Sequence, residues 1–579
     1  MTQHFFASSG AHAPRTNLPR GKACMNCRRR KIKCDGIKPV CGQCSRSPGA
    51  ADDCEYPLEG RSRTQQLEET IKKLQSRIGE LEATANESSI FLHEPYESGV
   101  EAPPELPRFP SWSPSSPLSA SSRVATPSSS STSSSLVLEE PPSDVIERLV
   151  DTFLSNFRQF GFFLDRDTFR RSALLTFPFG HYSRPSPALL SAVYMWGARL
   201  SHSLHPTYNE EAFLSCTLQN IHQDLAGRHP HRAIHSIQAE VLLSVYFLTL
   251  GRPVEGIYHS SAAVSLAISA GLHIIQPTPH SAGGGSRLSP QPTTFGVLEA
   301  PACPPAADSL EEGERICAFW TVVIVNNYWV AAHGSPSAIS YYDTPIDTPW
   351  PLELQDYVSP QLFDHVGASS GATVSKFLAG VIVDGFSPLA LLAKASLLLE
   401  RSITFSSRGR YADHSAGAFE TLDVLLQQFV HTIPIGISAV GGPEGLEARP
   451  CLLVAHTIAH AAIIRLHAHR IHTSETSRGK YLSAARSVVH LMNGIDFSVW
   501  PTSIDPIMGI LWTTVCEVFL SELSNMQQPG SFKFAQTYED YVACLQTILA
   551  TMSRFSSTSP LIDYFATRVK QTYNAVSGQ

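Results

Sequence analysis

The chain has 579 residues, a hydrophobic fraction of 43% and a formal net charge of −7. This length and apolar content allow more than one domain and a large buried core, which excludes a wholly disordered protein. The first residues, MTQHFFASSGAHAPR, contain no apolar run long enough for a signal peptide, and the best apolar stretch is interrupted by Asp384, Pro388 and Lys394. We therefore expect no membrane partner, and we expect the cysteines to be thiols or metal ligands in a reducing compartment.

Charge is distributed unevenly along the chain. Residues 20–63 carry eleven Lys and Arg against five Asp and Glu, a net charge of +6, which leaves −13 for the rest of the chain. A basic region on an acidic protein predicts a polyanionic partner for that region, most often nucleic acid.

Six of the twelve cysteines lie in this basic region with the spacing C-x2-C-x6-C-x6-C-x2-C-x9-C. They are Cys24, Cys27, Cys34, Cys41, Cys44 and Cys54. Zinc prefers four ligands in a tetrahedron, so six thiolates fill two sites only if two sulfurs are shared. The spacing therefore predicts a two-metal cluster, whose negative charge the neighbouring Arg and Lys would offset.

The same cysteines allow two other arrangements. A single zinc held by Cys24, Cys27, Cys41 and Cys44 would have a spacing shorter than the usual zinc pattern and would leave Cys34 unused. A disulfide framework is disfavoured by a reducing compartment. The other six cysteines are scattered singly through apolar sequence and are expected to be buried small hydrophobic residues.

The cysteine pattern resembles the fungal binuclear zinc cluster family, Zn(2)-Cys(6), in which each of two C-x2-C pairs is followed by a short basic helix and a further cysteine. The resemblance implies two Zn²⁺ per chain, with Cys24 and Cys41 bridging both ions. It also implies that Cys27 and Cys34 complete one site, and Cys44 and Cys54 the other. The nine residues before Cys54 are slightly more than the family commonly has, which puts only the geometry of that loop in doubt.

The basic run RRRKIK, residues 28–33, is interpreted as a solvated face, a nuclear import signal or a DNA-reading element, and these are not exclusive. On a short helix, Arg28 and Lys31, or Arg30 and Lys33, would share a face that enters the major groove. Because Lys and Arg bind the O6 and N7 acceptors of guanine, a G-rich triplet is a reasonable target.

The family resemblance implies more specifically a CGG half-site, with Arg30 and Lys31 at the positions that reach base edges. The remaining basic side chains are expected to hold phosphates without reading sequence. These are Arg28, Lys33, Arg61 and Arg63.

Residues 64–82, TQQLEETIKKLQSRIGELE, carry a 3-4 apolar repeat. Ile occupies the a positions and Leu the d positions, the preference of parallel dimers. The positions are Leu67, Ile71, Leu74, Ile78 and Leu81. One zinc module on one triplet should bind weakly, so a homodimer is expected. The alternative is an amphipathic helix packed on its own protein, because two heptads are marginal alone.

The sequence predicts five regions, which are a disordered N-terminus at 1–20, the zinc module at 21–60, a linker and short parallel coiled coil at 61–86, a disordered Ser/Pro-rich linker at 87–142 and an all-α regulatory domain at 143–579. In the last region, apolar residues recur every three to four positions over helical lengths. Such segments are 144–157, 187–204, 234–250, 256–272, 314–332, 419–433, 448–472 and 507–526, and a Pro/Gly-rich loop-out is expected at about 277–307.

Part of this helical region resembles the fungal-specific transcription factor domain, the regulatory region that usually accompanies the zinc cluster. The resemblance rests on residues 241–273, which end in Gly271, Leu272 and His273, and on residues 314–339. It covers about half of the region, and its motifs are looser than the cysteine pattern.

Two features could suggest an enzyme, and neither is convincing. Residues 367–371 fit G-x-S-x-G, but no buried strand precedes them as a nucleophile elbow requires. His456 and His460 are spaced as in zinc proteases, but Thr457 stands where the catalytic Glu is needed. With His467, these residues are expected to line a packed helix face, and the chain is expected not to be an enzyme.

The sequence therefore predicts a nuclear, DNA-binding regulator of RNA polymerase II transcription. A zinc cluster would select CGG sites in double-stranded DNA, the coiled coil would pair two modules, and the helical region would contact the transcription machinery or co-regulators. The alternative is a zinc-dependent protein-interaction factor, or co-regulator, that no longer reads DNA.

Overall fold

The computed structural model divides into two units, Met1–Leu106 and Pro107–Gln579. It describes residues 22–46, 54, 72, 140–201, 208–275, 303–341, 344–358, 372–381, 384–408, 416–434, 443–527 and 535–578. The predicted coiled coil, the Ser/Pro-rich linker, the G-x-S-x-G segment and most of the predicted loop-out therefore lie outside the described residues, except for Lys72, Cys303 and the positions around it.

In the first unit, two short helices share one construction. α1, Met25–Arg29, begins after Cys24, and α2, Gly42–Ser45, begins after Cys41. Each of these cysteines has an extended backbone, and its sulfur accepts a hydrogen bond from the N–H three residues later. A sulfur thus takes the place of the oxygen that usually caps a helix N-terminus, and the two halves of the unit repeat each other.

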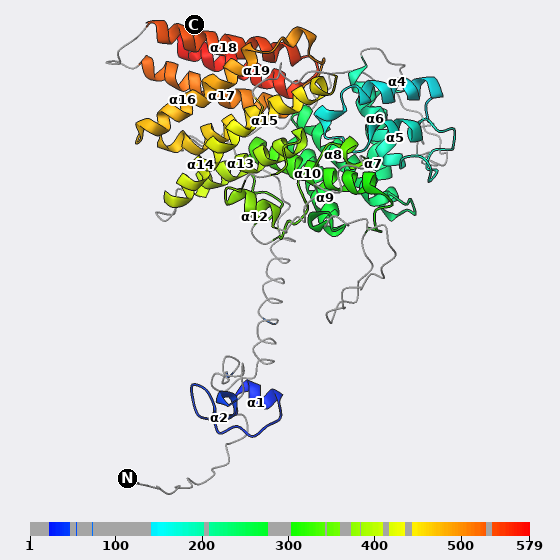
Figure 1. Ribbon diagram of the computed structural model, residues 1–579, viewed down its shortest axis with the longest axis vertical. Coiled ribbons are helices and arrows are strands. Elements are labelled where there is room, and N and C mark those ends of the chain that lie inside the picture. Colours follow the sequence, from blue (N-terminus) through cyan, green and yellow to red (C-terminus); the bar gives the residue numbers. More distant parts are fainter. Residues whose placement is uncertain are drawn as a thin grey trace, which may run out of the picture. The chain divides into compact units, whose positions relative to one another are not determined.

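The second unit is built from helices throughout its described residues (Figure 1). The α-helices are α4 Ser143–Leu154, α5 Arg166–Ala173, α6 Pro187–Leu200, α7 Glu210–Ala226, α8 Arg232–Thr249, α9 Pro253–Ser269, α10 Ser309–His333, α11 Leu354–Val358, α12 Thr373–Leu378, α13 Pro388–Arg408, α14 Ala416–Thr432, α15 Pro443–His467, α16 Glu475–Asn493, α17 Ile507–Met526, α18 Ala535–Phe555 and α19 Pro560–Ser577. Short 3₁₀ segments are η1 Phe157–Phe160, η2 Leu272–Ile274, η4 Ala468–Arg470 and η5 Phe497–Val499. The predicted all-α body is confirmed over the described residues, and each apolar segment named above overlaps one of these helices.

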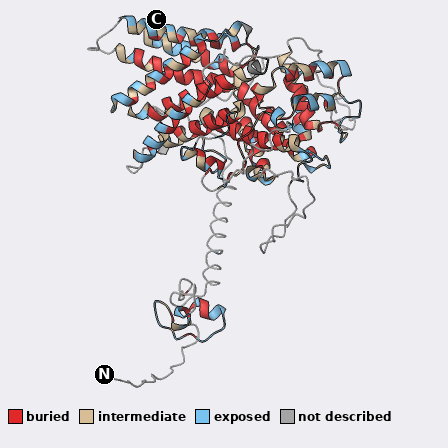
Figure 2. Cartoon of the chain, viewed as in Figure 1, coloured by how far each residue is buried: buried red, intermediate tan, exposed pale blue. Residues whose placement is uncertain are grey.

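Helix α10 contacts helices from both the earlier and the later part of the chain. This helix contacts α8 and α9 on one side and α13 and α17 on the other, so in Figure 1 it lies between the cyan and green helices of the first part and the yellow to red helices of the last. Figure 2 shows that buried residues fill the middle of this helical body, while exposed residues lie on its outer turns. One continuous apolar core therefore holds the second unit together.

A close contact at Gly256 fixes α8, α9 and α10 together. The indole of Trp329 on α10 lies flat on Gly256 of α9, where a Cβ would come within 2.0 Å of the ring. The indole N–H donates to the Ser244 hydroxyl at 2.8 Å, and this hydroxyl donates to the Gly256 carbonyl at 2.9 Å. The only side chain small enough for this position is therefore that of glycine.

Among the described residues, three helices are long and apolar enough to cross a membrane by length and composition, whereas the sequence predicted no membrane partner. They are Ser309–His333, Ala448–Arg470 and Ile507–Met526. In each, 83% of the apolar window is buried inside the helical body, so packing against neighbouring helices accounts for its composition.

Candidate metal centre and nucleic-acid interface

All six cysteines of the predicted cluster come together in the first unit, and all are buried. Their sulfurs form two groups of four, and within each group the sulfurs lie within 4.8 Å of one another. Both groups contain Cys24 and Cys41, whose sulfurs are 3.7 Å apart. Cys27 and Cys34 complete the first group, and Cys44 and Cys54 the second.

The local backbone explains this convergence. Because the first cysteine of each C-x2-C pair caps a short helix, the second lies on the first turn and turns back toward it. The two helices face each other, with 3.5 Å between the sulfurs of Cys27 and Cys41. Cys54, ten residues after Cys44 in the sequence, joins them, and its sulfur accepts the N–H of Cys41 at 3.2 Å.

The sulfur cluster fits two divalent metal ions. Apart from the cysteines, only Ala23 and Val40 pack partly against it among the described residues, so there is no apolar core to replace a metal. Burial raises the pKa of the Cys24 and Cys27 thiols. It opposes ionisation of Cys41 as well, but the N–H of Cys44 and the surrounding thiols lower the pKa of Cys41 to about 6. Two shared and four unshared sulfurs give each of two zinc ions four ligands.

Asp35 braces the two halves of this unit and was not identified from the sequence. One carboxylate oxygen accepts the N–H of Gly42 at 2.9 Å, at the start of α2, and the other accepts the N–H of Ile37 at 3.3 Å. A Cβ on Gly42 would lie 2.5 Å from the same carboxylate. The sequence feature that could have indicated this contact is an acidic residue directly after Cys34 together with a glycine at the first position of α2.

The backbone of the basic run, residues 28–33, differs from the prediction. The helix over this run ends at Arg29, and Lys31 has a left-handed backbone with φ of 52°. The N–H of Lys31 donates to the Arg28 carbonyl and that of Ile32 to the Cys27 carbonyl, a Schellman ending that glycine usually provides. Both predicted helical pairings, Arg28 with Lys31 and Arg30 with Lys33, are therefore wrong, because Lys31 and Lys33 lie beyond the end of the helix.

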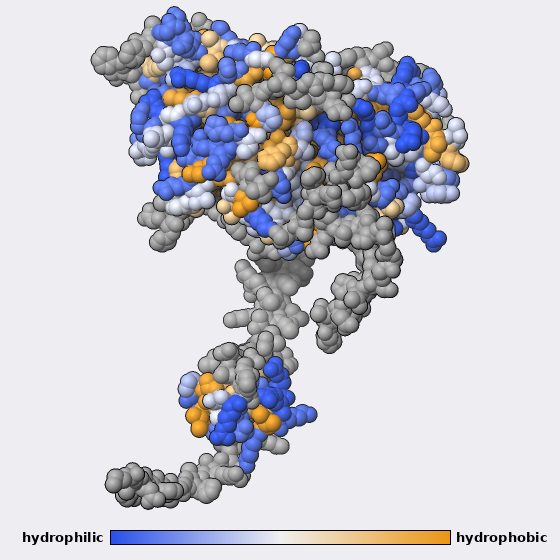
Figure 3. All heavy atoms as spheres, viewed as in Figure 1, coloured by the Kyte–Doolittle hydropathy of each residue, from blue (hydrophilic) through white to orange (hydrophobic). Residues whose placement is uncertain are grey.

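The cations of this run form an exposed surface next to the sulfur cluster. Arg28, Arg30, Lys31 and Lys33 are all exposed, with the first at the helix and the next two at its C-terminal end. Figure 3 shows that the described surface of this unit is largely hydrophilic, broken by hydrophobic patches. Arg61, Arg63 and the five predicted coiled-coil residues lie outside the described residues.

The histidines considered as a second metal site lie buried on packed helices. His456 bonds through Nε2 to the Pro434 carbonyl at 3.0 Å, and burial lowers the pKa of His460 to about 4. His467 contacts Ser477 and Asp423 through its two ring nitrogens. Among the described residues, the groups of His, Cys, Asp and Glu that could hold a metal are the two cysteine groups.

A cysteine-rich metal module followed by a helical body indicates the class of zinc-cluster proteins. Comparison with known families identifies the two domains. Residues 22–63 match the fungal Zn(2)-Cys(6) binuclear cluster domain, and residues 150–382 match the fungal specific transcription factor domain. The chain thus carries both domains, as the sequence resemblance implied, and the first of them holds two zinc ions. Helices α13 to α19 lie beyond the second match.

Three curated proteins are similar to a short part of the chain. The abscisic acid cluster transcription factor abl7 of Leptosphaeria maculans is 36% identical over 81 residues, 13% of this chain and 12% of the relative. The transcriptional activator protein acu-15 of Neurospora crassa is 38% identical over 63 residues, 10% and 7% of the two chains. An uncharacterized transcriptional regulatory protein of Schizosaccharomyces pombe is 41% identical over 63 residues, 11% and 8%. The match thus spans about a tenth of each relative, and no solved structure matches the chain significantly.

Proposed function

We propose that this protein is a nuclear regulator of RNA polymerase II transcription that binds CGG half-sites in double-stranded DNA through its zinc cluster. The observation that carries the proposal is the pair of four-sulfur groups sharing Cys24 and Cys41, directly beside an exposed run of Arg and Lys. The two matched domains and the names of the relatives, which all refer to transcription, support it.

In this mechanism, the six cysteines are the zinc ligands, and the ions, once bound, fix α1 and α2 against each other. Because α1 ends at Arg29, the side chains of Arg30 and Lys31 project from its C-terminal end. They donate hydrogen bonds to guanine O6 and N7 in the major groove. Arg28, Lys33, Arg61 and Arg63 hold phosphates and set the position of the module on the duplex.

Dimerisation and regulation are assigned to the segments that follow. The repeat formed by Leu67, Ile71, Leu74, Ile78 and Leu81 pairs two chains, so that two modules bind two half-sites. The helical body contacts the transcription machinery or co-regulators.

The test measures zinc per chain and binding of the full-length protein to a paired CGG duplex and to a scrambled duplex across a salt series. We expect two zinc ions and a preference for CGG that survives at higher salt. Lys31→Ala should weaken CGG binding by about tenfold or more while scarcely affecting the scrambled duplex. Arg28→Ala is the comparison variant and should weaken binding to both duplexes equally.

Two results would contradict this function. Equal loss on both duplexes for Lys31→Ala would remove the base-reading role. One zinc per chain, or salt-sensitive binding without sequence preference, would instead favour the zinc-dependent co-regulator that does not read DNA.

A further inference from the structure

The helical body contains a cavity of about 180 Å³ between its first and last parts. The cavity is lined by η1 and the segment after it, by the start of α5, by α8, α10, α13 and α15, by the segment at the start of α11, and by the residue that precedes Pro506 and α17. Residues within the matched fungal specific transcription factor domain therefore meet helices that lie beyond it. An engineered apolar cavity of about 150 Å³ is large enough to bind benzene, so this one can hold a substituted six-membered ring.

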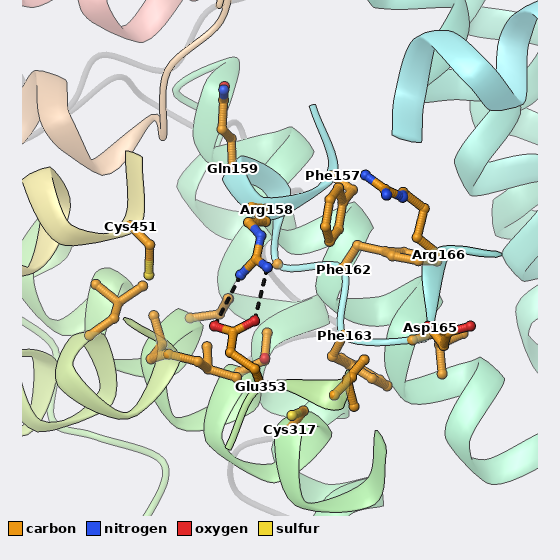
Figure 4. Close-up of a pocket in the computed structure, with 18 of the residues that line it drawn as sticks. Phe157, Arg158, Gln159, Phe162, Phe163, Asp165, Arg166, Cys317, Glu353 and Cys451 are labelled. Carbon is orange, nitrogen blue, oxygen red and sulfur yellow. Dashed lines mark hydrogen bonds and ion pairs between the residues drawn. The ribbon is translucent and has the colours of Figure 1, made fainter. Parts of the chain in front are cut away.

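One ion pair inside the cavity is already complete. Figure 4 shows Arg158 and Glu353 pointing toward each other, with Cys451 on one side and Phe162 on the other. The two guanidinium nitrogens donate to the two carboxylate oxygens of Glu353 at 2.9 and 3.4 Å. This bidentate pair neutralises itself, so an added ligand need not supply charge there.

The remaining charge of the cavity is negative. Its lining has the acids Asp165, Asp167, Glu353 and Asp505 against the bases Arg158 and Arg166. Asp165 and Asp167 lie at the partly open side, where Asp165 caps α5. Asp505, in contrast, is only 8% exposed.

Asp505 is held by neutral donors alone. Its carboxylate accepts the hydroxyl of Tyr328 at 2.9 Å and the N–H of Ile507 at 3.1 Å. No ion pair to it occurs in the described part of the chain. Burial raises its pKa to about 7, as expected for a carboxylate without an ion-pair partner. A buried carboxylate without a cation beside it is costly to ionise.

The other walls suit the body of an organic cation. Phe157, Phe162 and Phe163 supply aromatic surface, and the guanidinium of Arg158 lies 5.4 Å from the centre of the Phe157 ring. Cys317 and Cys451 also line the cavity, and burial raises the pKa of both thiols, that of Cys451 to about 12. They are therefore neutral, polarisable walls rather than competing anions.

We propose that this cavity binds a small organic amine, with its ammonium group on the carboxylate of Asp505 and its apolar body against the phenylalanine side chains. Ammonium supplies the cation that Asp505 lacks, and aromatic faces attract cations electrostatically. The bound amine would contact elements from both parts of the helical body and favour the arrangement in which they meet. The proposal concerns binding in the helical body and does not depend on whether the zinc module reads DNA.

The test uses the full-length protein and three probes of similar shape, which are benzylamine, benzyl alcohol and benzoate. We expect titration calorimetry to show that benzylamine binds at least about tenfold more tightly than benzyl alcohol, because a charge-assisted hydrogen bond is stronger than a neutral one. Benzoate should not bind, because its charge would face Asp505. Asp505→Asn should remove the preference for the amine while leaving weak binding of the alcohol.

Asp224→Asn is the matched control. Asp224 is also only 8% exposed, burial raises its pKa, and it accepts a backbone N–H near the start of a helix, that of Ala188 on α6, but it does not line the cavity. This variant should bind benzylamine like the wild type. Benzoate or benzyl alcohol binding as tightly as benzylamine, no binding of benzylamine, or an unchanged preference in Asp505→Asn would overturn the proposal.

A measurement on the wild type keeps the proposal testable if Asp505→Asn fails to fold. The other titratable groups lining the cavity are Tyr328, Cys451 and Cys317, whose raised pKa values leave them neutral, the Arg158–Glu353 pair, and Asp165, Arg166 and Asp167 at its partly open side. The affinity for benzylamine should therefore rise severalfold between pH 6 and 8 as Asp505 ionises, whereas that for benzyl alcohol should not. A flat profile for benzylamine would contradict the role of Asp505.

Discussion

The two units of this protein bury different kinds of core. In the zinc module the buried core is six cysteines, with only Ala23 and Val40 packed partly against them among the described residues. In the helical body it is a continuous set of aliphatic and aromatic side chains from α4 to α19. A module this small cannot bury enough apolar surface to fold by hydrophobic burial alone, so it needs the metal that its sulfurs bind.

The two units also differ in the groups that surround their buried ionisable side chains. In the module, buried sulfurs lie less than 4 Å apart, and their ionised forms are compatible only around cations. In the body, some buried ionisable groups contact only carbonyls, aromatic rings or neutral donors, as at Lys394 and Asp505. The comparison therefore predicts that metal removal and core substitutions act on separate units.

Removing zinc should have the largest effect, and it should be confined to the first unit. Because binding energy at a structural zinc site is folding energy, about 10–16 kcal/mol in zinc-finger peptides, chelation should abolish DNA binding and make residues 22–46 sensitive to proteases. The thermal transition of the helical body, followed by calorimetry, should not change.

Single cysteine variants sharpen this test. Cys41→Ala removes a sulfur common to both groups and should lose both zinc ions, whereas Cys34→Ala should retain more zinc per chain because it belongs to one group. Cys516→Ala, at a buried thiol on α17, is the control and should keep the wild-type zinc content. A Cys41 variant with two zinc ions would show that the sulfurs are not shared.

Gly256→Ala should have the largest effect among changes of the body. The added methyl would lie 2.0 Å from the buried Trp329 ring, so α9 and α10 must separate or the indole must leave its bond to Ser244. We expect a loss of about 3 kcal/mol or more in the free energy of unfolding of the body, with zinc content unchanged.

Gly479→Ala provides the matched control for that substitution. Gly479 is also helical, but it is exposed and a Cβ there meets nothing within 4 Å. Alanine should therefore stabilise α16 by up to about 1 kcal/mol, as expected from helix propensity. Equal effects of the two substitutions in chemical denaturation would contradict the close contact at Trp329.

The cysteine spacing and the apolar periodicity predicted much of this architecture from the sequence alone. The cysteine spacing predicted a two-metal cluster because zinc coordination restricts how six sulfurs can be shared. The apolar recurrence predicted the helical body, since helices bury one stripe of side chains. Ile507–Met526, for example, was predicted with the bounds that the structure shows.

Other features depend on contacts that spacing does not encode. The helix over the basic run ends earlier than predicted because Lys31 takes a left-handed backbone, a conformation usually marked by glycine. Asp35 acts on Gly42 seven residues away, through a loop whose path the sequence does not specify. Lys394 was read as an interruption of an apolar segment, but the structure buries it within α13.

The last prediction concerns the pH dependence of stability at Lys394. Its side chain is 1% exposed, and Nζ donates to the carbonyls of Asp384 and Gly385 and lies 4.8 Å from the centre of the Trp350 ring. Burial nevertheless lowers its pKa from 10.5 to about 8. The folded state therefore holds fewer protons than the unfolded state between these values, so the contribution of Lys394 to stability rises with pH across this range.

Lys394→Met isolates this contribution because it keeps the length of the side chain and removes its charge. Relative to the variant, the wild type should become more stable from pH 8 to 10.5, by at most about 1.4 kcal/mol per pH unit. Below pH 8 the difference should be constant. Lys570→Met, at an exposed lysine on α19, is the control and should follow the wild type. A constant difference across the whole range would show that Lys394 keeps its proton, and that carbonyls and aromatic rings compensate a buried charge in the body as fully as zinc does in the module.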